Sequence, residues 1–177
     1  MSRALHSSHE VSGRVEEVLA VLTGPQWSAR RAEVLHDGSQ VVERARRSDG
    51  GVHLVVSREL PAGGPGFLER FLPPDGRVVQ TDDWGPAQAG VRSGTWQVVI
   101  PGIPARLGGS MRLEPVASGT RYVVDGEISV PIPLVGGKAE RFIAEMVEKL
   151  ADREAELLQD ALAGPDALAG PDALSGG

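Results

Sequence analysis

The chain of 177 residues contains no cysteine. This absence excludes disulfide bonds, thiolate catalysis and cysteine-ligated zinc. Aromatic residues are scarce, at 4% of the chain. No segment approaches the ~18 consecutive apolar residues of a membrane span, and the amino terminus lacks the apolar run of a signal peptide. We therefore expect a cytoplasmic protein that does not insert into a membrane.

Positive charge is also in short supply. The net charge at pH 7 is −6. Nucleic acids and anionic membrane surfaces both attract concentrated basic patches, so neither is an expected partner. The length fits one domain with a substantial core, because a chain of this size buries about 70% of its unfolded surface. Nothing in the composition indicates the oligomeric state.

The first forty residues predict one strand and two helices. Residues 3–11 alternate weakly in polarity, as in a strand. Ser12 is expected to cap the helix that follows, in which apolar residues repeat at helical spacing up to Leu22. A shorter helix is expected around Trp27–Val34. The residues expected on one side of it are Trp27, Arg30, Arg31 and Val34.

From residue 40 to residue 130 the polarity alternates with period two. The sequence Ser48-Asp49-Gly50-Gly51 is a strong hairpin signal, and further turn signals separate the later runs. Several short strands joined by close turns indicate an antiparallel meander. The expected strands span residues 40–47, 51–60, 77–84, 91–100, 105–115 and 120–130.

After Pro131-Ile132-Pro133 the pattern becomes helical and stays so to about Ala161. The expected apolar stripe consists of Ala139, Phe142, Ile143, Met146, Leu150, Leu157 and Ala161, with Glu140 among the residues of the other faces. Residues 164–177 repeat the sequence Pro-Asp-Ala-Leu. We expect them to form a disordered tail after a domain that spans residues 1–163.

The predicted order is one strand, two helices, six strands and one long helix. An antiparallel sheet has one face to bury, and only the last helix is long enough to lie across it. We therefore expect an α+β fold, in which a curved seven-stranded antiparallel sheet packs on the long C-terminal helix. Such a geometry leaves room for a pocket between the sheet and the helix.

Three stretches carry a family resemblance: residues 60–73, residues 77–84 and residues 130–140. The last is the most distinctive, because Val130-Pro131-Ile132-Pro133 leads through Gly136-Gly137 directly into the long helix. Over about residues 1–160 the chain resembles the START-like (SRPBCC, helix-grip) superfamily, and within it an uncharacterised actinobacterial family. The resemblance implies a helix-grip fold and a hydrophobic ligand, and it implies no activity.

Metal and cofactor sites are not expected. His6 and His9 are three residues apart on a predicted strand, so their side chains point to opposite faces. His36 lies in a turn and His53 lies alone on another strand, so no second ligand accompanies either of them. Gly136-Gly137-Lys138 lacks the remaining residues of a phosphate-binding loop.

The adjacent carboxylates Asp82 and Asp83 diverge on a strand, so they cannot flank one substrate bond. Asp82 falls on the side of Gln80 and Trp84, where it could orient a ligand inside the pocket. The segment 65–74 holds Phe67 and Phe71 between glycines and prolines. It is either a fixed plug of the core or a hydrophobic gate over the pocket mouth.

The leading functional hypothesis is the binding of a small hydrophobic or amphipathic molecule, such as a lipid or a polyketide-like compound. A cyclase- or aromatase-type enzyme would have Tyr122, Asp82 and His53 as acid–base groups. A protein-interaction module would use the Phe67/Phe71 surface. Whether the inward residues touch a ligand or only one another stays open. The residues expected to line the pocket are Leu54, Val56, Phe67, Phe71, Gln80, Asp82, Trp84, Trp96, Val98, Met111, Tyr122, Val124, Ile128, Phe142, Met146 and Leu150.

Overall fold

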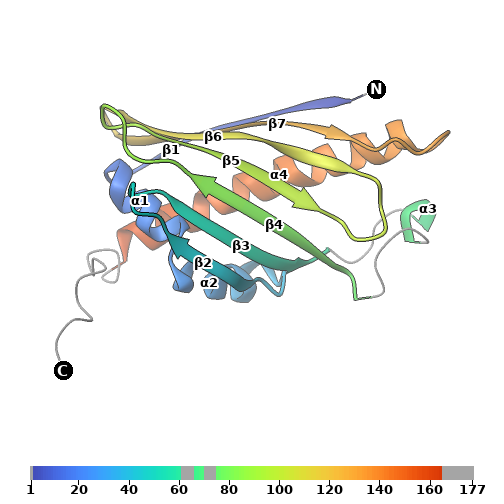
Figure 1. Ribbon diagram of the computed structural model, residues 1–177, viewed down its shortest axis with the longest axis horizontal. Coiled ribbons are helices and arrows are strands. Elements are labelled where there is room, and N and C mark those ends of the chain that lie inside the picture. Colours follow the sequence, from blue (N-terminus) through green and yellow to red (C-terminus); the bar gives the residue numbers. More distant parts are fainter. Residues whose placement is uncertain (1, 61–65, 70–74, 165–177) are drawn as a thin grey trace.

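Seven strands form one antiparallel sheet in the order β1-β7-β6-β5-β4-β3-β2 (Figure 1). The computed structural model describes residues 2–60, 66–69 and 75–164. Every strand pairs with its neighbour in the sequence except β1, which pairs with β7. The strands are β1 Arg3–Val11, β2 Gln40–Arg46, β3 Val52–Glu59, β4 Arg77–Trp84, β5 Arg92–Val99, β6 Arg106–Val116 and β7 Gly119–Ser129.

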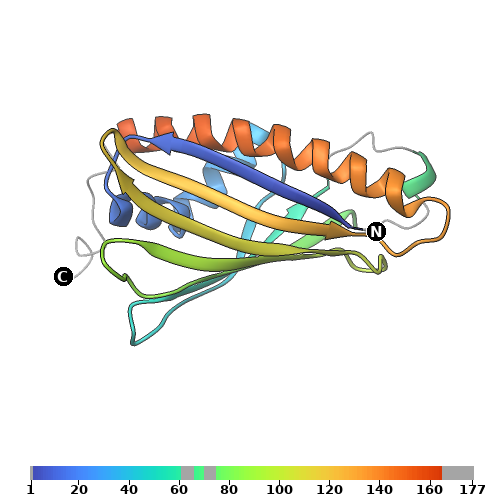
Figure 2. The same ribbon diagram turned by 90° about the horizontal axis from the view of Figure 1, so that it is seen from above.

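Four helices complete the described part of the chain: α1 Val15–Leu22, α2 Pro25–Leu35, α3 Gly66–Glu69 and α4 Gly136–Ala163. Helix α4 has 28 residues and lies across one face of the curved sheet. Figure 2 shows it running close to β1 and β7, whereas β2 and β3 curve away from it. The expected fold class and order of elements are therefore confirmed.

Local chemistry explains where the first two helices begin. Helix α1 starts after Arg14, whose backbone N–H donates to the Glu17 carboxylate at 2.7 Å. Ser12 was expected to cap this helix, and that prediction is wrong. Its backbone N–H donates instead to the side-chain oxygen of Gln159 on α4 at 2.9 Å. Helix α2 begins at Pro25, a residue that suits a first helical position because it lacks an N–H.

Two expectations about helix faces need correction. Arg30 and Val34 were placed on the same side as Trp27 and Arg31, but Arg30 is exposed and Val34 is 45% exposed, so the buried face of α2 is narrower than expected. Glu140 was assigned to an outward face of α4, but it is buried. Its carboxylate accepts the backbone N–H of Val130 at 2.9 Å, which pairs a donor that the end of β7 leaves free.

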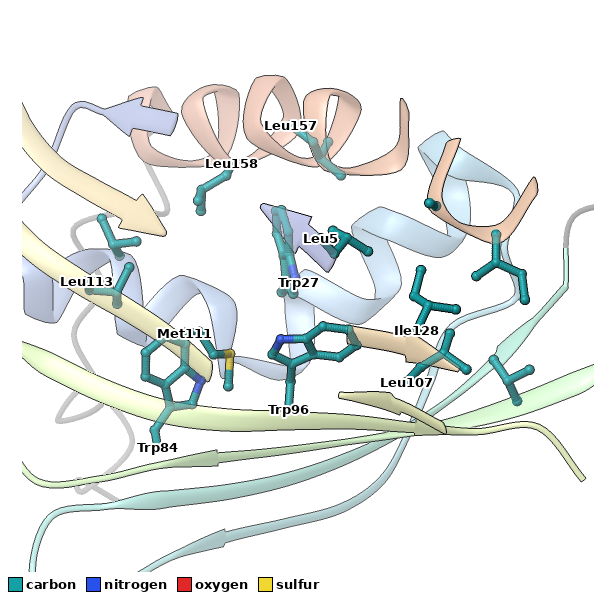
Figure 3. Close-up of a cluster of buried hydrophobic side chains, with 14 of the residues drawn as sticks. Leu5, Trp27, Trp84, Trp96, Leu107, Met111, Leu113, Ile128, Leu157 and Leu158 are labelled. Carbon is teal, nitrogen blue, oxygen red and sulfur yellow. The ribbon is translucent and has the colours of Figure 1, made fainter. Parts of the chain in front are cut away.

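The hydrophobic core lies between the sheet, α1 and α4. In Figure 3, Leu157 and Leu158 of α4 face Trp84, Trp96 and Met111, which point up from the sheet. Close backbone contacts of α4 run mainly to β1, α1 and β7. The helix is therefore anchored on one side of the sheet, and its distance from β3 and β4 is set by the side chains between them.

The expected tail at 164–177 lies, from residue 165 on, outside the described residues, as does Phe71. The choice between a plug and a gate for segment 65–74 also falls largely outside them. Helix α3 carries Phe67, which is half-buried and packs against the core.

Candidate functional site

Strand register places one row of residues across the whole concave side of the sheet. Leu54 pairs with Asp82, Asp82 with Trp96, and Trp96 with Gly109. Directly opposed residues point to the same side, so every second residue shares this face, here called the inner face. All of the strand residues predicted to line a pocket lie on it. They are Leu54, Val56, Gln80, Asp82, Trp84, Trp96, Val98, Met111, Tyr122, Val124 and Ile128.

Helix α4 packs closely on the inner face at its two ends. Ala139 and Ile143 are buried near its start, and Leu157 and Leu158 are buried near its end. The residues between them on the same side remain half-buried, namely Phe142, Met146, Val147 and Leu150. Opposite them, the inner-face residues Gln80, Asp82, Val98, Tyr122 and Val124 are half-buried as well. Side chains of both layers therefore keep some accessible surface at mid-helix.

The floor of this region is the indole ring of Trp96. Its Nε1 donates to the backbone carbonyl of Asp125 two strands away, at 3.0 Å. A Cβ atom added at Gly126 would lie 2.4 Å from Cζ2 of this ring. Gly126 therefore allows the tryptophan to lie against the sheet, where a side chain would otherwise displace it.

A second aromatic pair borders the floor. The rings of Trp84 and Tyr122 are 6.3 Å apart between centroids and are tilted by 42°. Burial raises the pKa of the Tyr122 hydroxyl, so it is a neutral donor at physiological pH. The hydroxyl donates a weak hydrogen bond to the Met111 sulfur at 4.0 Å.

Charged groups converge beside this apolar floor, and they come from separate elements: Arg31 from α2, Arg58 from β3 and Asp82 from β4. Burial and, to a smaller extent, the like charge of Arg58 lower the pKa of Arg31 to about 9, against the attraction of Asp37. Burial also lowers the pKa of Arg58, against the attraction of Asp82 and Asp37. The two cations are thus close enough to affect each other.

Arg31 is held by acidic partners, although its buried Nη1 makes no hydrogen bond within the described part of the chain. It donates to Oδ2 of Asp37 from Nη2 at 2.9 Å and from Nε at 3.2 Å, and it also contacts Glu154 of α4. Asp37 in turn accepts from the backbone N–H and the hydroxyl of Ser39, at 3.0 and 2.6 Å. With side chains 2% and 10% exposed, Arg31 and Asp37 form a buried link between α2 and β2.

Arg58 has fewer and longer contacts with acidic side chains than Arg31 has. Its side chain is 19% exposed, and its Nη1 lies 3.9 Å from Oε1 of Glu154, the oxygen that also contacts Arg31. Its Nε is buried and has no hydrogen-bond partner within residues 2–60, 66–69 and 75–164. A buried, unpaired donor on a cation is costly, and each of the two arginines has one such nitrogen among the described residues, with Glu154 in contact with both.

The two adjacent aspartates do diverge. Asp82 points inward, where Gln80 donates to its Oδ1 at 2.8 Å. Burial raises the pKa of Asp82, while Gln80, Arg58 and Arg31 oppose the rise. Asp83 points outward, and its Oδ1 lies 2.7 Å from Nδ1 of His53. The grouping of His53 with Asp82 and Tyr122 is therefore wrong, because the register puts His53 on the opposite face of the sheet.

Two hollows of the surface lie away from the middle of α4. One, of about 380 Å³, is lined by residues that include Arg3, Leu134 and Lys138. Another, of about 490 Å³, is lined by residues that include Pro104 and Ser129. Within the described part of the chain no three His, Cys, Asp or Glu residues are grouped to hold a metal ion.

Comparison with known proteins places the chain in a family. Residues 6–162 match the model of a protein family of unknown function, DUF2505. The chain belongs to this family. An uncharacterised protein of Mycobacterium tuberculosis is 29% identical over 162 residues, which is 87% of this chain and 93% of the relative.

Solved structures of similar fold extend this result beyond the family. A START superfamily protein from Mycobacterium smegmatis has a TM-score of 0.51 at 15% identity, covering 90% of this chain and 97% of its own. Norcoclaurine synthase from Thalictrum flavum has a TM-score of 0.53 at 15% identity, covering 89% and 87%. This DUF2505 member therefore has the START-like, helix-grip fold. Within the described residues, no helix is both long and apolar enough to span a membrane.

Sequence reasoning missed the two inner arginines. Arg58 continues the series Leu54, Val56 on the same face of β3, so strict alternation would have placed it inside. Arg31 was assigned to the side of Trp27, and the burial of that side makes it a core residue. In both cases the signal was present, but a charged residue is ordinarily read as exposed.

Proposed function

We propose that this protein binds a small hydrophobic or amphipathic molecule between the sheet and α4. The observation that carries the proposal is the accessible surface left at mid-helix, where apolar residues of both layers remain half-buried between buried ends. Dense packing is the rule in protein interiors, so incomplete burial of residues such as Met146 and Val124 in the middle of two facing layers favours a ligand site. The START-like fold of this family member supports the same function.

The residues predicted from the sequence to line the pocket keep that role as a proposal. Trp96 and Val98 would form its floor, with Val124 beside them, and Met146 and Leu150 of α4 would form its roof. Asp82 and Gln80 would lie at its polar side. Phe67 would close one end of the pocket.

Filling the proposed pocket tests the function. The Met146→Trp substitution adds an indole on the inward side of α4, and Glu145→Trp adds the same group on its exposed side. A fluorescent apolar probe should bind the wild type and Glu145→Trp equally and should lose binding to Met146→Trp. If the site is open, Met146→Trp should cost less than the ~1–3 kcal/mol typical of overpacking. A large loss of stability in Met146→Trp, together with no probe binding to the wild type, would contradict the proposal.

Native mass spectrometry provides an independent measurement. Protein purified from its own host should carry an added mass that is released on denaturation, and Met146→Trp should carry none. The mass would also identify the ligand.

A cyclase- or aromatase-type enzyme is the second candidate. The observation that favours it is the presence of two proton-carrying groups, Asp82 and Tyr122, on the same inner face as Arg58. A structural neighbour, norcoclaurine synthase, is named as an enzyme. The retained ligand decides between the two: a binder returns it unchanged after incubation, whereas an enzyme converts it, and Asp82→Asn would then stop the conversion.

The interaction-module hypothesis is weaker. It requires an exposed Phe67/Phe71 surface with no pocket beneath it, and Phe67 is half-buried and packs against the core.

A further inference from the structure

We propose that this protein docks on anionic membrane surfaces through the turn before α4, with the Leu134 side chain among the lipids and the surrounding cations on their headgroups. The turn comprises residues 131–135 and is here called the α4 turn. The inference adds an interaction surface to the proposed function and does not depend on it, because it concerns the outside of the molecule and a separate set of residues.

Leu134 lies at the tip of the α4 turn. Its side chain is 100% exposed, and among the described residues the next most exposed large apolar side chain, Val42, reaches 64%. The backbone of Leu134 has a φ of 67°, in the left-handed region that residues other than glycine, asparagine and aspartate seldom adopt. An apolar side chain held outward at a strained position points to a contact outside the chain.

Hydrogen bonds hold the α4 turn in this conformation. The Ile132 N–H donates to the Val130 carbonyl, and the Gly136 N–H donates to the Ile132 carbonyl, each at 2.8 Å. The Glu140 carboxylate accepts the Val130 N–H at 2.9 Å, so the first helical turn of α4 is tied to the end of β7. Leu134 is therefore presented by a preformed turn.

Four cations surround the α4 turn, and they come from separate elements. The surface hollow of about 380 Å³ is lined by Arg3 of β1 together with Lys138 and Arg141 of α4. Leu134 lines the same hollow. The hollow of about 490 Å³, on the β6 side of β7, is lined by Arg106 and also reaches the α4 turn. The two hollows therefore flank one exposed leucine and place basic side chains on both sides of it.

The two ends of the sheet differ in how their cations are paired. At the opposite end, Arg14 pairs with Glu17 and Arg121 with Glu10, each at 2.9 Å. Around the α4 turn, none of the four cations forms an ion pair with another described residue. The carboxylate that lines the first hollow, that of Glu140, already accepts a backbone N–H. The cations at this end are therefore available to anions outside the chain.

The net charge of −6 opposes a negative surface, which is why the composition alone predicts no such partner. Exposed charges are screened beyond ~8 Å at physiological ionic strength, so the charges next to the surface decide the contact. Along β7 and α4 the exposed carboxylates closest in sequence to the α4 turn are Glu127 and Glu145, and these two do not balance four cations. The protein is therefore oriented with this end toward an anionic surface.

The shape of this end favours a bilayer over a protein partner. Figures 1 and 2 show the start of β1, the end of β7 and the start of α4 at the same end of the molecule. A stable protein interface needs ~1,000 Å² or more of well-packed surface. A single leucine among long cationic side chains does not form such a surface. A bilayer requires only an apolar side chain at the acyl boundary and basic groups at the headgroups.

The test is cosedimentation of the full chain with lipid vesicles. Vesicles of equal parts phosphatidylcholine and phosphatidylglycerol should bind the wild type, less so as salt is added. Vesicles of phosphatidylcholine alone should bind it roughly tenfold more weakly or less still. Lys138→Gln/Arg141→Gln should weaken binding to the anionic vesicles ~20- to 30-fold, at about fivefold for each cation. Lys149→Gln/Arg153→Gln removes two exposed cations farther along α4 and should bind like the wild type.

Leu134 is tested separately from the cations. Leu134→Asn should weaken vesicle binding several-fold without lowering the melting temperature, because asparagine adopts the left-handed region more readily than leucine. Val42→Asn, at an exposed position of β2, is the control and should leave vesicle binding unchanged. The chain contains no cysteine, so Leu134→Cys can carry a single polarity-sensitive fluorophore. Its emission should shift to shorter wavelength on anionic vesicles, and the same label on Val42→Cys should not shift.

The first measurement uses the wild type, so it does not depend on any variant folding. No binding to anionic vesicles, or equal binding to both kinds of vesicle, would overturn the proposal. Equal losses in the two double variants, or no shift of a label at position 134, would overturn the assignment to the α4 turn. Met146→Trp, which fills the proposed pocket, should bind vesicles like the wild type, so a failure of ligand binding and a failure of docking are distinguishable. A loss of docking in Met146→Trp would also contradict the assignment.

Discussion

The inner face has two halves that differ in chemistry. The apolar half, on β5, β6, β7 and β1, contributes buried residues such as Leu107, Leu113 and Ile128, and the buried ends of α4 pack on it. The polar half, on β3 and β4 beneath α2, contributes Arg58 and Asp82, with Arg31 above them. Both halves belong to one continuous sheet, and the second surrounds its charged groups with buried apolar residues such as Leu54, Val56 and Trp84.

The difference separates residues that hold the fold from residues that are free to act on a ligand. Replacing a buried ion pair by apolar residues often costs no stability, so buried charges are a poor explanation of a fold. A charged cluster that persists beside a well-packed apolar half is therefore better explained by function. Within the polar half, Arg31 donates twice to Asp37 whereas Arg58 lies 3.9 Å from Glu154, and each arginine has one buried nitrogen without a hydrogen bond among the described residues.

The largest effect is expected for the paired arginine. Arg31→Ala would leave the buried Asp37 without its cation, and breaking a buried ion pair typically costs ~3–5 kcal/mol. Urea unfolding followed by circular dichroism measures the loss. Arg14→Ala is the matched control, because it removes an arginine whose side chain is 86% exposed and paired with Glu17. It should leave the unfolding midpoint unchanged, and an equally small change for Arg31→Ala would mean that the polar half does not hold α2 in place.

A moderate effect is expected in the apolar half. Gly126→Ala places a Cβ atom 2.4 Å from the Trp96 ring, so the indole must move from the sheet. Overpacking of this kind costs ~1–3 kcal/mol. Thermal unfolding measures the cost, and near-ultraviolet circular dichroism reports the displaced indole. Gly137→Ala is the control, since a Cβ atom there meets no atom within 4 Å. An unchanged spectrum for Gly126→Ala would show that the ring does not rest on this glycine.

The period of the polar and apolar residues, together with the residues typical of turns, was sufficient to predict the architecture. The alternation over residues 40–130 is clean because one side of the antiparallel sheet faces the core, and the helical stripe after Pro133 is long because α4 spans the whole sheet. The errors were confined to places where a polar residue has a tertiary partner. Ser12 forms a hydrogen bond with Gln159 and does not cap the helix. Glu140 accepts a hydrogen bond from the backbone at the end of β7.

The apolar half of the site was predictable, and the polar half was not. The alternation of side chains along a strand is enough to select inward residues such as Trp96 and Val124, because it depends only on position along the strand. The convergence of Arg31, Arg58 and Asp82 depends on the curvature of the sheet and on where α2 lies, and neither is written in a local pattern. His53 was grouped with Asp82 on chemistry alone, and the register separates them.

The smallest effect is expected from Asp82, and it depends on pH. Burial raises the folded-state pKa of Asp82 above 3.8, although Gln80, Arg58 and Arg31 oppose the rise and Asp83 adds to it. Between 3.8 and the folded-state value, the native protein holds more protons than the unfolded chain. The free energy of unfolding therefore falls as the pH rises through this window, and no penalty exists below it. Because Asp82 keeps accessible surface, the change should be smaller than that for Arg31.

Asp82→Asn cannot ionise, so it should lack this decrease. Urea midpoints of the wild type and Asp82→Asn, measured from about pH 4 to about pH 8, should diverge with rising pH, with the variant gaining relative to the wild type. A constant difference would mean that Asp82 is no less ionised in the folded protein than in the unfolded chain. The opposite trend, a wild type that gains stability as Asp82 ionises, would mean that its carboxylate is paired with Arg58. In that case Arg58 would already be neutralised by a group of the protein itself.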